Sequence, residues 1–181
     1  MLSELGVPGT VFVPTADMAE GSLRVWPGIG EWVGTRWEPE LTGASWAELA
    51  RLIDAGWEIG SHTRTHPHLT SLDDESLRRE LRGSREDCVA ATNLPCNSLA
   101  YPFGEADSRV AAAAREAGYA AAATLADHIP APTHGRPDPL LLPRLGVHQP
   151  DDSARLRLKS EIFLRGRWAW NAAQSLRRAV R

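Results

Sequence analysis

Lysine, cysteine, tyrosine and methionine are all scarce in this chain. Nineteen of the twenty basic residues are arginine, and Lys159 is the single lysine. The two cysteines, Cys88 and Cys96, do not form a CxxC pattern, so they give no sign of a cysteine-based redox or metal motif. Two alternatives stay open for them: a disulfide, or a buried thiol in a helix beside a thiol in the following turn.

Long apolar runs are also missing. No stretch of about eighteen apolar residues occurs, which excludes a conventional membrane-spanning helix. The chain has 181 residues and 43% hydrophobic side chains, enough for one domain with a sizeable core.

Charge is distributed unevenly along the chain. Residues 153–181 hold eight basic residues and one acidic residue, a net charge of +7, whereas the rest holds twelve basic and twenty-two acidic residues, a net charge of −10. The main body therefore offers no basic face for nucleic acid. We expect one domain over residues 1–150 and a basic amphipathic helical extension over residues 151–181.

The extension has an apolar stripe opposite its arginines. Trp168, Ala172 and Leu176 lie at helical spacing in it. This stripe either packs against the outside of the domain or lies on an anionic polymer or membrane surface.

Strand-like and helix-like segments alternate along the domain. Apolar runs predict strands near residues 10–13, 56–60, 98–101, 119–124 and 140–147. Capping and periodicity predict helices near residues 45–55, 71–93 and 107–117, the first two opened by capping boxes at Ser45 and Ser71. Such alternation indicates an α/β fold with a parallel sheet, but it does not distinguish a barrel from an open sheet.

His62 and His66 are the most informative residues. Four residues apart, they lie on one side of a single turn, where both imidazoles can reach one metal ion. Their turn follows the predicted strand 56–60, and α/β folds place their chemistry at such carboxyl ends. His68, beside Pro67, is expected to be an ordinary loop or cleft residue.

Two further segments are candidates for a site. Tyr101, Pro102, Phe103 and Gly104 follow a predicted strand, where Gly104 permits a close backbone approach to a ligand; a plain β-turn is the alternative. Residues 16–44 read as a long loop in which Trp37, with two other tryptophans, could stack on sugar rings or simply pack the loop onto the domain.

These segments together resemble the polysaccharide deacetylases, the NodB-homology or family 4 carbohydrate esterases. The resemblance spans roughly residues 2–148 and rests on residues 5–14, 52–69, 99–104 and 142–147. It implies a distorted (β/α) barrel and a divalent metal cofactor, most plausibly Zn²⁺, held by His62 and His66. It also implies a first motif, a strand ending in Asp-Asp-Gly ahead of Gly6, that supplies a base and a third metal ligand. The chain has no counterpart of that motif, and by this comparison it is N-terminally truncated.

The resemblance also assigns roles to individual residues. The backbone N–H of Phe103 would hold the oxyanion, and His148 would match the late histidine that acts as general acid. Ala100 stands where the family has an arginine that orients the base. Arg144 is the natural substitute for that arginine, with a surface position at a strand end as the alternative. Tyr101, Pro102, Gly104 and Trp37 would contact substrate.

The sequence therefore predicts a metal-dependent hydrolase that removes N-acetyl groups from N-acetylhexosamine-containing polysaccharide. One alternative is a non-catalytic relative that binds metal or glycan, since a missing base alone could silence the activity. Another is a hydrolase of the same fold that acts on small cyclic amides.

Overall fold

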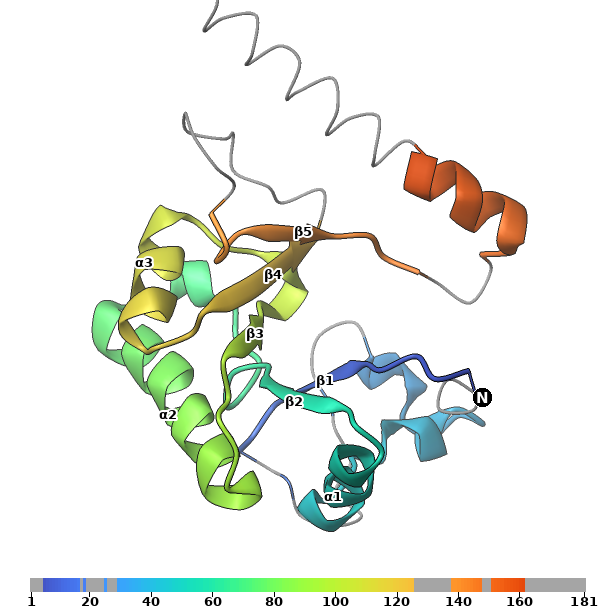
Figure 1. Cartoon of the computed structure of the whole chain (residues 1–181), viewed down its shortest axis with the longest axis horizontal. Coiled ribbons are helices and arrows are strands. Elements are labelled where there is room, and N and C mark those ends of the chain that lie inside the picture. Colours follow the sequence, from blue (N-terminus) through green and yellow to red (C-terminus); the bar gives the residue numbers. More distant parts are fainter. Residues whose placement is uncertain are drawn as a thin grey trace, which may run out of the picture.

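Five parallel strands form one curved sheet with three helices packed on its outer side (Figure 1). The computed structural model describes residues 5–16, 18, 25, 29–125, 138–147 and 151–161. The strands are β1 (Thr10–Val13), β2 (Glu58–Ser61), β3 (Ser98–Ala100), β4 (Ala121–Leu125) and β5 (Leu142–Arg144). The helices are α1 (Trp46–Asp54), α2 (Asp74–Thr92) and α3 (Ser108–Glu116), with short 3₁₀ turns at Gly30–Trp32, Glu38–Leu41, Leu69–Ser71 and Pro102–Gly104.

The strands lie in the sheet in the order in which they occur in the chain, β1-β2-β3-β4-β5, and every pair is parallel. An unreversed order with the helices on one face is the winding of a (β/α) barrel, whereas a doubly wound sheet reverses its order. The Arg144 guanidinium of β5 lies 5.6 Å from the ring centroid of Phe12 in β1. The sheet therefore curls until side chains of its first and last described strands meet. The predicted α/β fold with a parallel sheet is confirmed, and closure into a barrel stays a prediction.

The helix beginnings follow from local sequence. Ser45 caps α1: its hydroxyl accepts from the Glu48 N–H at 3.3 Å, and the Glu48 carboxylate accepts from the Ser45 N–H at 2.8 Å. The predicted N-cap of the second helix, Ser71, is two residues too early. Its N-cap is Asp73, which accepts from the Ser76 N–H, while Ser71 ends the short turn that places Leu69 in the core.

The outer face of the sheet carries the core. One apolar cluster joins β3 and β4 to α2 and α3 and includes Leu81, Leu99 and Val110, and a smaller one joins β1 and β2 to α1 through Val13, Leu49 and Ile59. Cys88 and Cys96 are both free thiols buried in the larger cluster, so the loop thiol is not exposed.

The inner, concave face is lined by different side chains. A Cβ on Gly60 would lie 2.7 Å from the Phe12 ring, its partner in the β1–β2 register, so the missing side chain makes room for that ring. Beside it, the Glu58 carboxylate accepts from the hydroxyls of Thr10 and Ser98. The inner face thus carries polar and small residues around the Phe12 ring, while most apolar residues face the helices.

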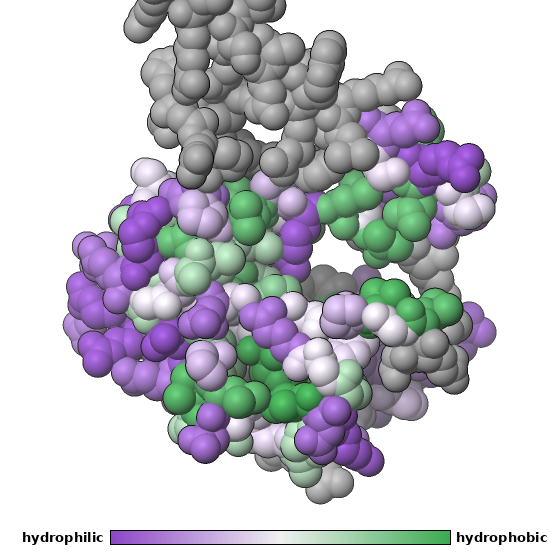
Figure 2. All heavy atoms as spheres, viewed as in Figure 1, coloured by the Kyte–Doolittle hydropathy of each residue, from purple (hydrophilic) through white to green (hydrophobic). Residues whose placement is uncertain are grey.

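Residues 153–161 are helical, and Leu158 in this segment is 59% exposed. The space-filling view shows hydrophobic surface there and a hydrophilic surface over α2 (Figure 2). The predicted stripe at Trp168, Ala172 and Leu176 lies outside the described residues. Within the described parts of the chain, no helix is long and apolar enough to cross a bilayer.

Candidate functional site

Two turns at the carboxyl ends of neighbouring strands form the site. The first, residues 62–66, follows β2, and the second, Pro102–Gly104, follows β3. Because β2 and β3 are parallel neighbours, their ends lie at the same edge of the sheet. Both motifs therefore lie where the sequence predicted, in turns that directly follow strands.

The histidine turn has an unusual backbone. Thr63 and His66 have φ angles of 68° and 59°, in the left-handed region that non-glycine residues seldom adopt. Thr63 is fully buried; its N–H donates to the Ser61 hydroxyl and its own hydroxyl accepts from the His66 N–H, both at 3.1 Å. Left-handed residues cost about 1–3 kcal/mol each, so this shape persists only because its surroundings enforce it.

The two imidazoles converge. The Nε2 atoms of His62 and His66 lie 3.2 Å apart. His62 Nδ1 lies 2.7 Å from the Ala100 carbonyl oxygen, which can only accept. Nδ1 therefore carries the proton in the neutral ring, and Nε2 presents its lone pair. Two nitrogens on a tetrahedral zinc ion with Zn–N bonds of about 2.05 Å would stand about 3.3 Å apart, so the pair fits one such ion.

Both rings are held neutral. Burial lowers the pKa of His62 to about 4, against the opposing bond to Ala100, and the nearby His66 and Arg144 lower it further. Burial also lowers the pKa of His66. Since imidazole binds metal only when neutral, both rings are ready to bind at neutral pH.

The described residues supply two metal ligands and no more. Among residues 5–16, 18, 25, 29–125, 138–147 and 151–161, no group of three His, Cys, Asp or Glu side chains is placed to hold a metal. The imidazole pair therefore fits a divalent metal, but it makes only half of a four-coordinate shell.

The second turn brings Phe103 against the histidines. Its ring lies edge-on to His66, with centroids 4.7 Å apart, and stacks on His68 at 3.9 Å. His68 in turn lies 2.9 Å from the Glu105 carboxylate. His68, expected to be an ordinary loop residue, thus helps to frame the site.

The backbone of the second turn is also left-handed, with φ angles of 57° at Phe103 and 73° at Gly104. A Cβ on Gly104 would lie 2.5–2.6 Å from Leu125. Within the described part of the chain, the Phe103 N–H donates no hydrogen bond. The turn therefore presents a backbone donor ready for an acceptor.

Arg144 reaches the concave side from β5. Its guanidinium lies over the Phe12 ring, and its buried Nε has no hydrogen-bond partner among the described residues. Burial lowers the pKa of Arg144 from its ordinary value. A buried guanidinium nitrogen without an acceptor indicates a place for an anionic group.

The other predicted substrate residues differ in how far they can reach a substrate. Tyr101 is fully buried and its hydroxyl donates to the Leu140 carbonyl, so only its backbone can meet a substrate. Pro102 is buried too. Trp37 is 41% exposed and packs against Arg36, and no described contact joins it to the histidine turn. His148 lies outside the described residues.

Sequence reasoning missed the residues that support the histidine turn. Glu80 and Asp87 of α2 accept hydrogen bonds from Arg64 and Thr65. Their spacing of seven residues on one helix face, directly after the histidine motif, was the available signal.

Comparisons with known proteins identify the family and the fold. The sequence model of the polysaccharide deacetylase family matches residues 1–122. The structure is similar to a polysaccharide deacetylase from Bacillus cereus, with 28% identity and a TM-score of 0.56 over 65% of this chain and 37% of that one. A comparison with curated protein sequences found no match.

Two more distant structures share the fold. The Streptococcus pyogenes deacetylase solved with acetate has 17% identity and a TM-score of 0.64, over 87% of this chain and 61% of that one. A de-N-acetylase from Aggregatibacter actinomycetemcomitans has 14% identity and a TM-score of 0.64, over 87% and 67%. The chain thus spans less than two thirds of the first two structures.

The matched region, residues 1–122 of 181, includes the histidine turn and the Phe103 turn. It therefore covers both segments that form the site. This chain belongs to the polysaccharide deacetylase family.

Proposed function

We propose that this chain is a metal-dependent hydrolase that removes N-acetyl groups from glycans built of N-acetylhexosamine. The observation behind the proposal is the convergence of two neutral imidazole nitrogens, 3.2 Å apart, beside the turn that holds Phe103. Family membership supports the deacetylase class, and the site residues support the details below.

Zn²⁺ is the proposed ion, because neutral imidazole nitrogen at tetrahedral spacing suits it. His62 and His66 would hold it through their Nε2 atoms. When bound, such an ion polarises an amide carbonyl and lowers the pKa of a coordinated water. The bond from His62 Nδ1 to the Ala100 carbonyl keeps that ring in the tautomer that can bind.

The protein itself supplies a hydrogen-bond donor and a cation. In this proposal the Phe103 N–H donates to the acetamide oxygen as negative charge develops there, which for such a donor contributes about 2.7–4 kcal/mol of barrier lowering. Arg144 would orient a carboxylate that serves as the base for the attacking water; the described residues place no such carboxylate at its buried Nε. The general-acid role of His148 stays a prediction.

The substrate is proposed to lie over the two turns. The backbone of Tyr101, Pro102 and Gly104 would border its acetamide group, and Trp37 would meet a more distant sugar ring through its exposed face. The proposed substrate is thus an N-acetylated glycan.

Acetate release tests the proposal. The full chain is incubated with N-acetylglucosamine oligomers and Zn²⁺, and acetate is measured for the wild type, for His62→Ala plus His66→Ala, and for Arg82→Gln. Arg82 pairs with Glu86 on the outer side of α2, so it serves as a surface control. We expect release from the wild type and the control and none from the double variant; equal release from all three contradicts the proposal.

A non-catalytic relative that binds metal or glycan is the second candidate. It is favoured by the two-ligand set, because no cluster of three possible metal ligands occurs among the described residues. Zinc binding lost in the double variant, with no acetate release from any protein, selects this candidate. Ring opening of small cyclic amides, with one new carboxylate per C–N bond cleaved and no acetate released from glycan, would instead select a hydrolase of that class.

A further inference from the structure

One face of α2 lies directly against the histidine turn. Glu80, Gly83 and Asp87 are three and four residues apart, so they lie along that face. All three contact residues of the turn, while Leu77, Leu81 and Cys88 on the adjoining face fill the core. The helix thus joins the apolar core to the site.

Glu80 accepts three hydrogen bonds from the turn. Its Oε2 accepts from the Arg64 N–H at 2.8 Å and from the Thr65 N–H at 3.0 Å, and its Oε1 accepts from the Thr65 hydroxyl at 2.7 Å. These two amides lie between the left-handed residues Thr63 and His66. The carboxylate therefore provides acceptors that the bent backbone does not supply there.

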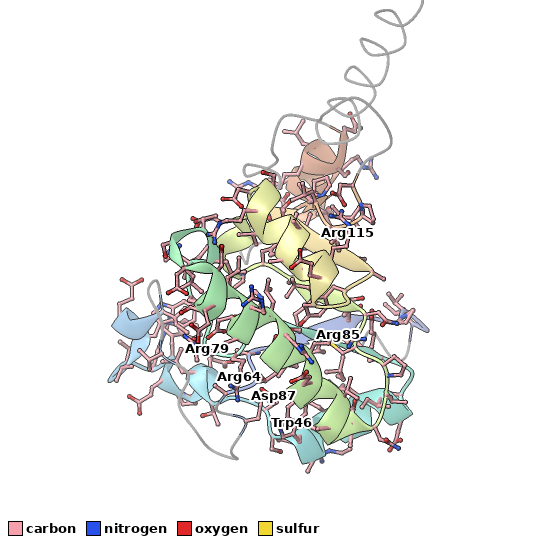
Figure 3. The ribbon with its side chains drawn as sticks, turned by 90° about the vertical axis from the view of Figure 1, so that its left-hand side faces the viewer. Trp46, Arg64, Arg79, Arg85, Asp87 and Arg115 are labelled. Carbon is pink, nitrogen blue, oxygen red and sulfur yellow. The ribbon has the colours of Figure 1, made fainter. Side chains whose placement is uncertain are left out.

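Asp87 and Gly83 hold the Arg64 side chain along the helix. A Cβ on Gly83 would lie 2.8 Å from Arg64 Cδ, so the glycine leaves the space in which this side chain runs. Arg64 Nε then donates to Asp87 Oδ2 at 2.9 Å (Figure 3). The Thr15 hydroxyl, just beyond β1, donates to the same oxygen at 2.6 Å.

The histidine turn is also fixed by backbone hydrogen bonds from the chain that follows β1. The Thr15 N–H donates to the Thr63 carbonyl and the Ala16 N–H to the Arg64 carbonyl, which ties the turn to the chain after β1. Among the described hydrogen bonds, only the Glu80 carboxylate accepts from the backbone amides of Arg64 and Thr65, whereas Asp87 accepts from the Arg64 side chain. The orientation of the two imidazoles thus depends on side chains outside both motifs.

We propose that Glu80 and Asp87 are positioning residues that hold the strained histidine turn in its metal-binding shape. The inference rests on the proposed metal site, but neither carboxylate binds metal or substrate. Ordered supporting hydrogen bonds of this kind typically change metal affinity about 10–100-fold when removed. The same carboxylates would be merely structural if the turn kept its shape without them.

Three variants of the full chain separate these roles. Glu80→Ala removes all three acceptor contacts. Glu80→Gln keeps a carbonyl oxygen for the two amides and an amide group that can donate to the Thr65 hydroxyl. Glu86→Ala is the matched control, because Glu86 lies on the same helix and pairs only with Arg82 in the described structure.

Two measurements are made on each variant: Zn²⁺ affinity by titration calorimetry, and hydrogen exchange of the Arg64 and Thr65 amides by NMR. We expect Glu80→Ala to bind Zn²⁺ about 10–100-fold more weakly and to exchange both amides faster, while core amides of α2 stay protected. Glu80→Gln and Glu86→Ala should stay within about threefold of the wild type in affinity.

Unchanged Zn²⁺ affinity in Glu80→Ala overturns the inference, even if its stability falls. Should Glu80→Ala not fold, Thr65→Val removes one of the three donors and is measured in the same way, with weaker binding expected. Zn²⁺ binding that depends on Glu80, in a protein that releases no acetate, supports the positioning role and contradicts the proposed hydrolase. A wild type that binds no Zn²⁺ overturns the positioning role.

Discussion

The two turns of the site reach similar backbone shapes by different means. Both place non-glycine residues at positive φ, Thr63 and His66 in one and Phe103 in the other. The histidine turn is held by hydrogen bonds that its backbone N–H groups donate to the side-chain oxygens of Ser61, Thr63 and Glu80. The Phe103 turn has two backbone hydrogen bonds, from the Gly104 and Glu105 N–H groups, and no described side-chain acceptor. Its further support is packing, with the Phe103 ring between two imidazoles and Gly104 against Leu125.

This difference suits the two proposed tasks. A metal ligand must keep its orientation, and directional hydrogen bonds fix orientation. A backbone oxyanion donor must leave its N–H unengaged, so packing has to fix the turn instead. Substitutions that act on one kind of support should therefore affect one turn more than the other.

The largest effect is expected at the packed turn. Gly104→Ala adds a methyl group 2.5 Å from Leu125 at a φ of 73°, so both overpacking and backbone strain should destabilise the protein, by about 2–4 kcal/mol. Gly34→Ala is the control: its φ is 77°, but nothing lies within 4 Å of the added atom, so only the strain of about 1 kcal/mol applies. Urea unfolding measures both, and equal losses would contradict the packing account.

An intermediate effect is expected from pH, and only at the histidine turn. The folded-state pKa of His62 is about 4, below its ordinary 6.5, so the unfolded chain takes up the proton first. The stability linked to His62 is thus present above pH 6.5 and is lost as pH falls from 6.5 toward 4. Without metal, the loss between pH 7 and pH 5 should be about 2 kcal/mol.

The pH effect is isolated with His62→Gln. This variant lacks the titrating group, so its unfolding free energy should fall less between pH 7 and pH 5 than that of the wild type. An identical fall in both proteins would show that the loss comes from other groups.

The smallest effect is expected from one hydroxyl. Thr63→Val keeps the shape of the side chain but leaves the His66 N–H without its acceptor, which should cost about 1 kcal/mol. Thr63→Ser keeps the hydroxyl and should lose less. Urea unfolding and Zn²⁺ affinity are measured for both variants; a greater loss in Thr63→Ser would contradict the role of this hydrogen bond.

Local signals predicted the fold well. The capping box at Ser45, the strand at Thr10–Val13 and the helix that follows Asp107 lie where the sequence placed them. Their determinants are neighbours in the chain, so a short window of sequence contains them. The start of α2 was misplaced because Ser71 and Asp73 both offer capping oxygens, and burial of Leu69 decided between them.

The site was predictable in part. The four-residue spacing of His62 and His66 predicted that their rings converge. It could not show that the Tyr101 side chain turns into the core toward Leu140. Nor could it show that Arg64 lies along Gly83 to reach Asp87. Such contacts depend on how α2 packs against the sheet, which no local pattern encodes.

The contact between Arg144 and Phe12 also bears on how the site forms over time. The contact between the two imidazoles, and the contacts of Glu80 and Asp87 with Arg64, all lie within the stretch from β2 to α2. These contacts therefore close short loops. Arg144 meets Phe12 only when the last described strand comes round to the first. Closing longer loops costs more chain entropy and is slower. The histidine pair should therefore be organised early in folding, and the guanidinium should join it last.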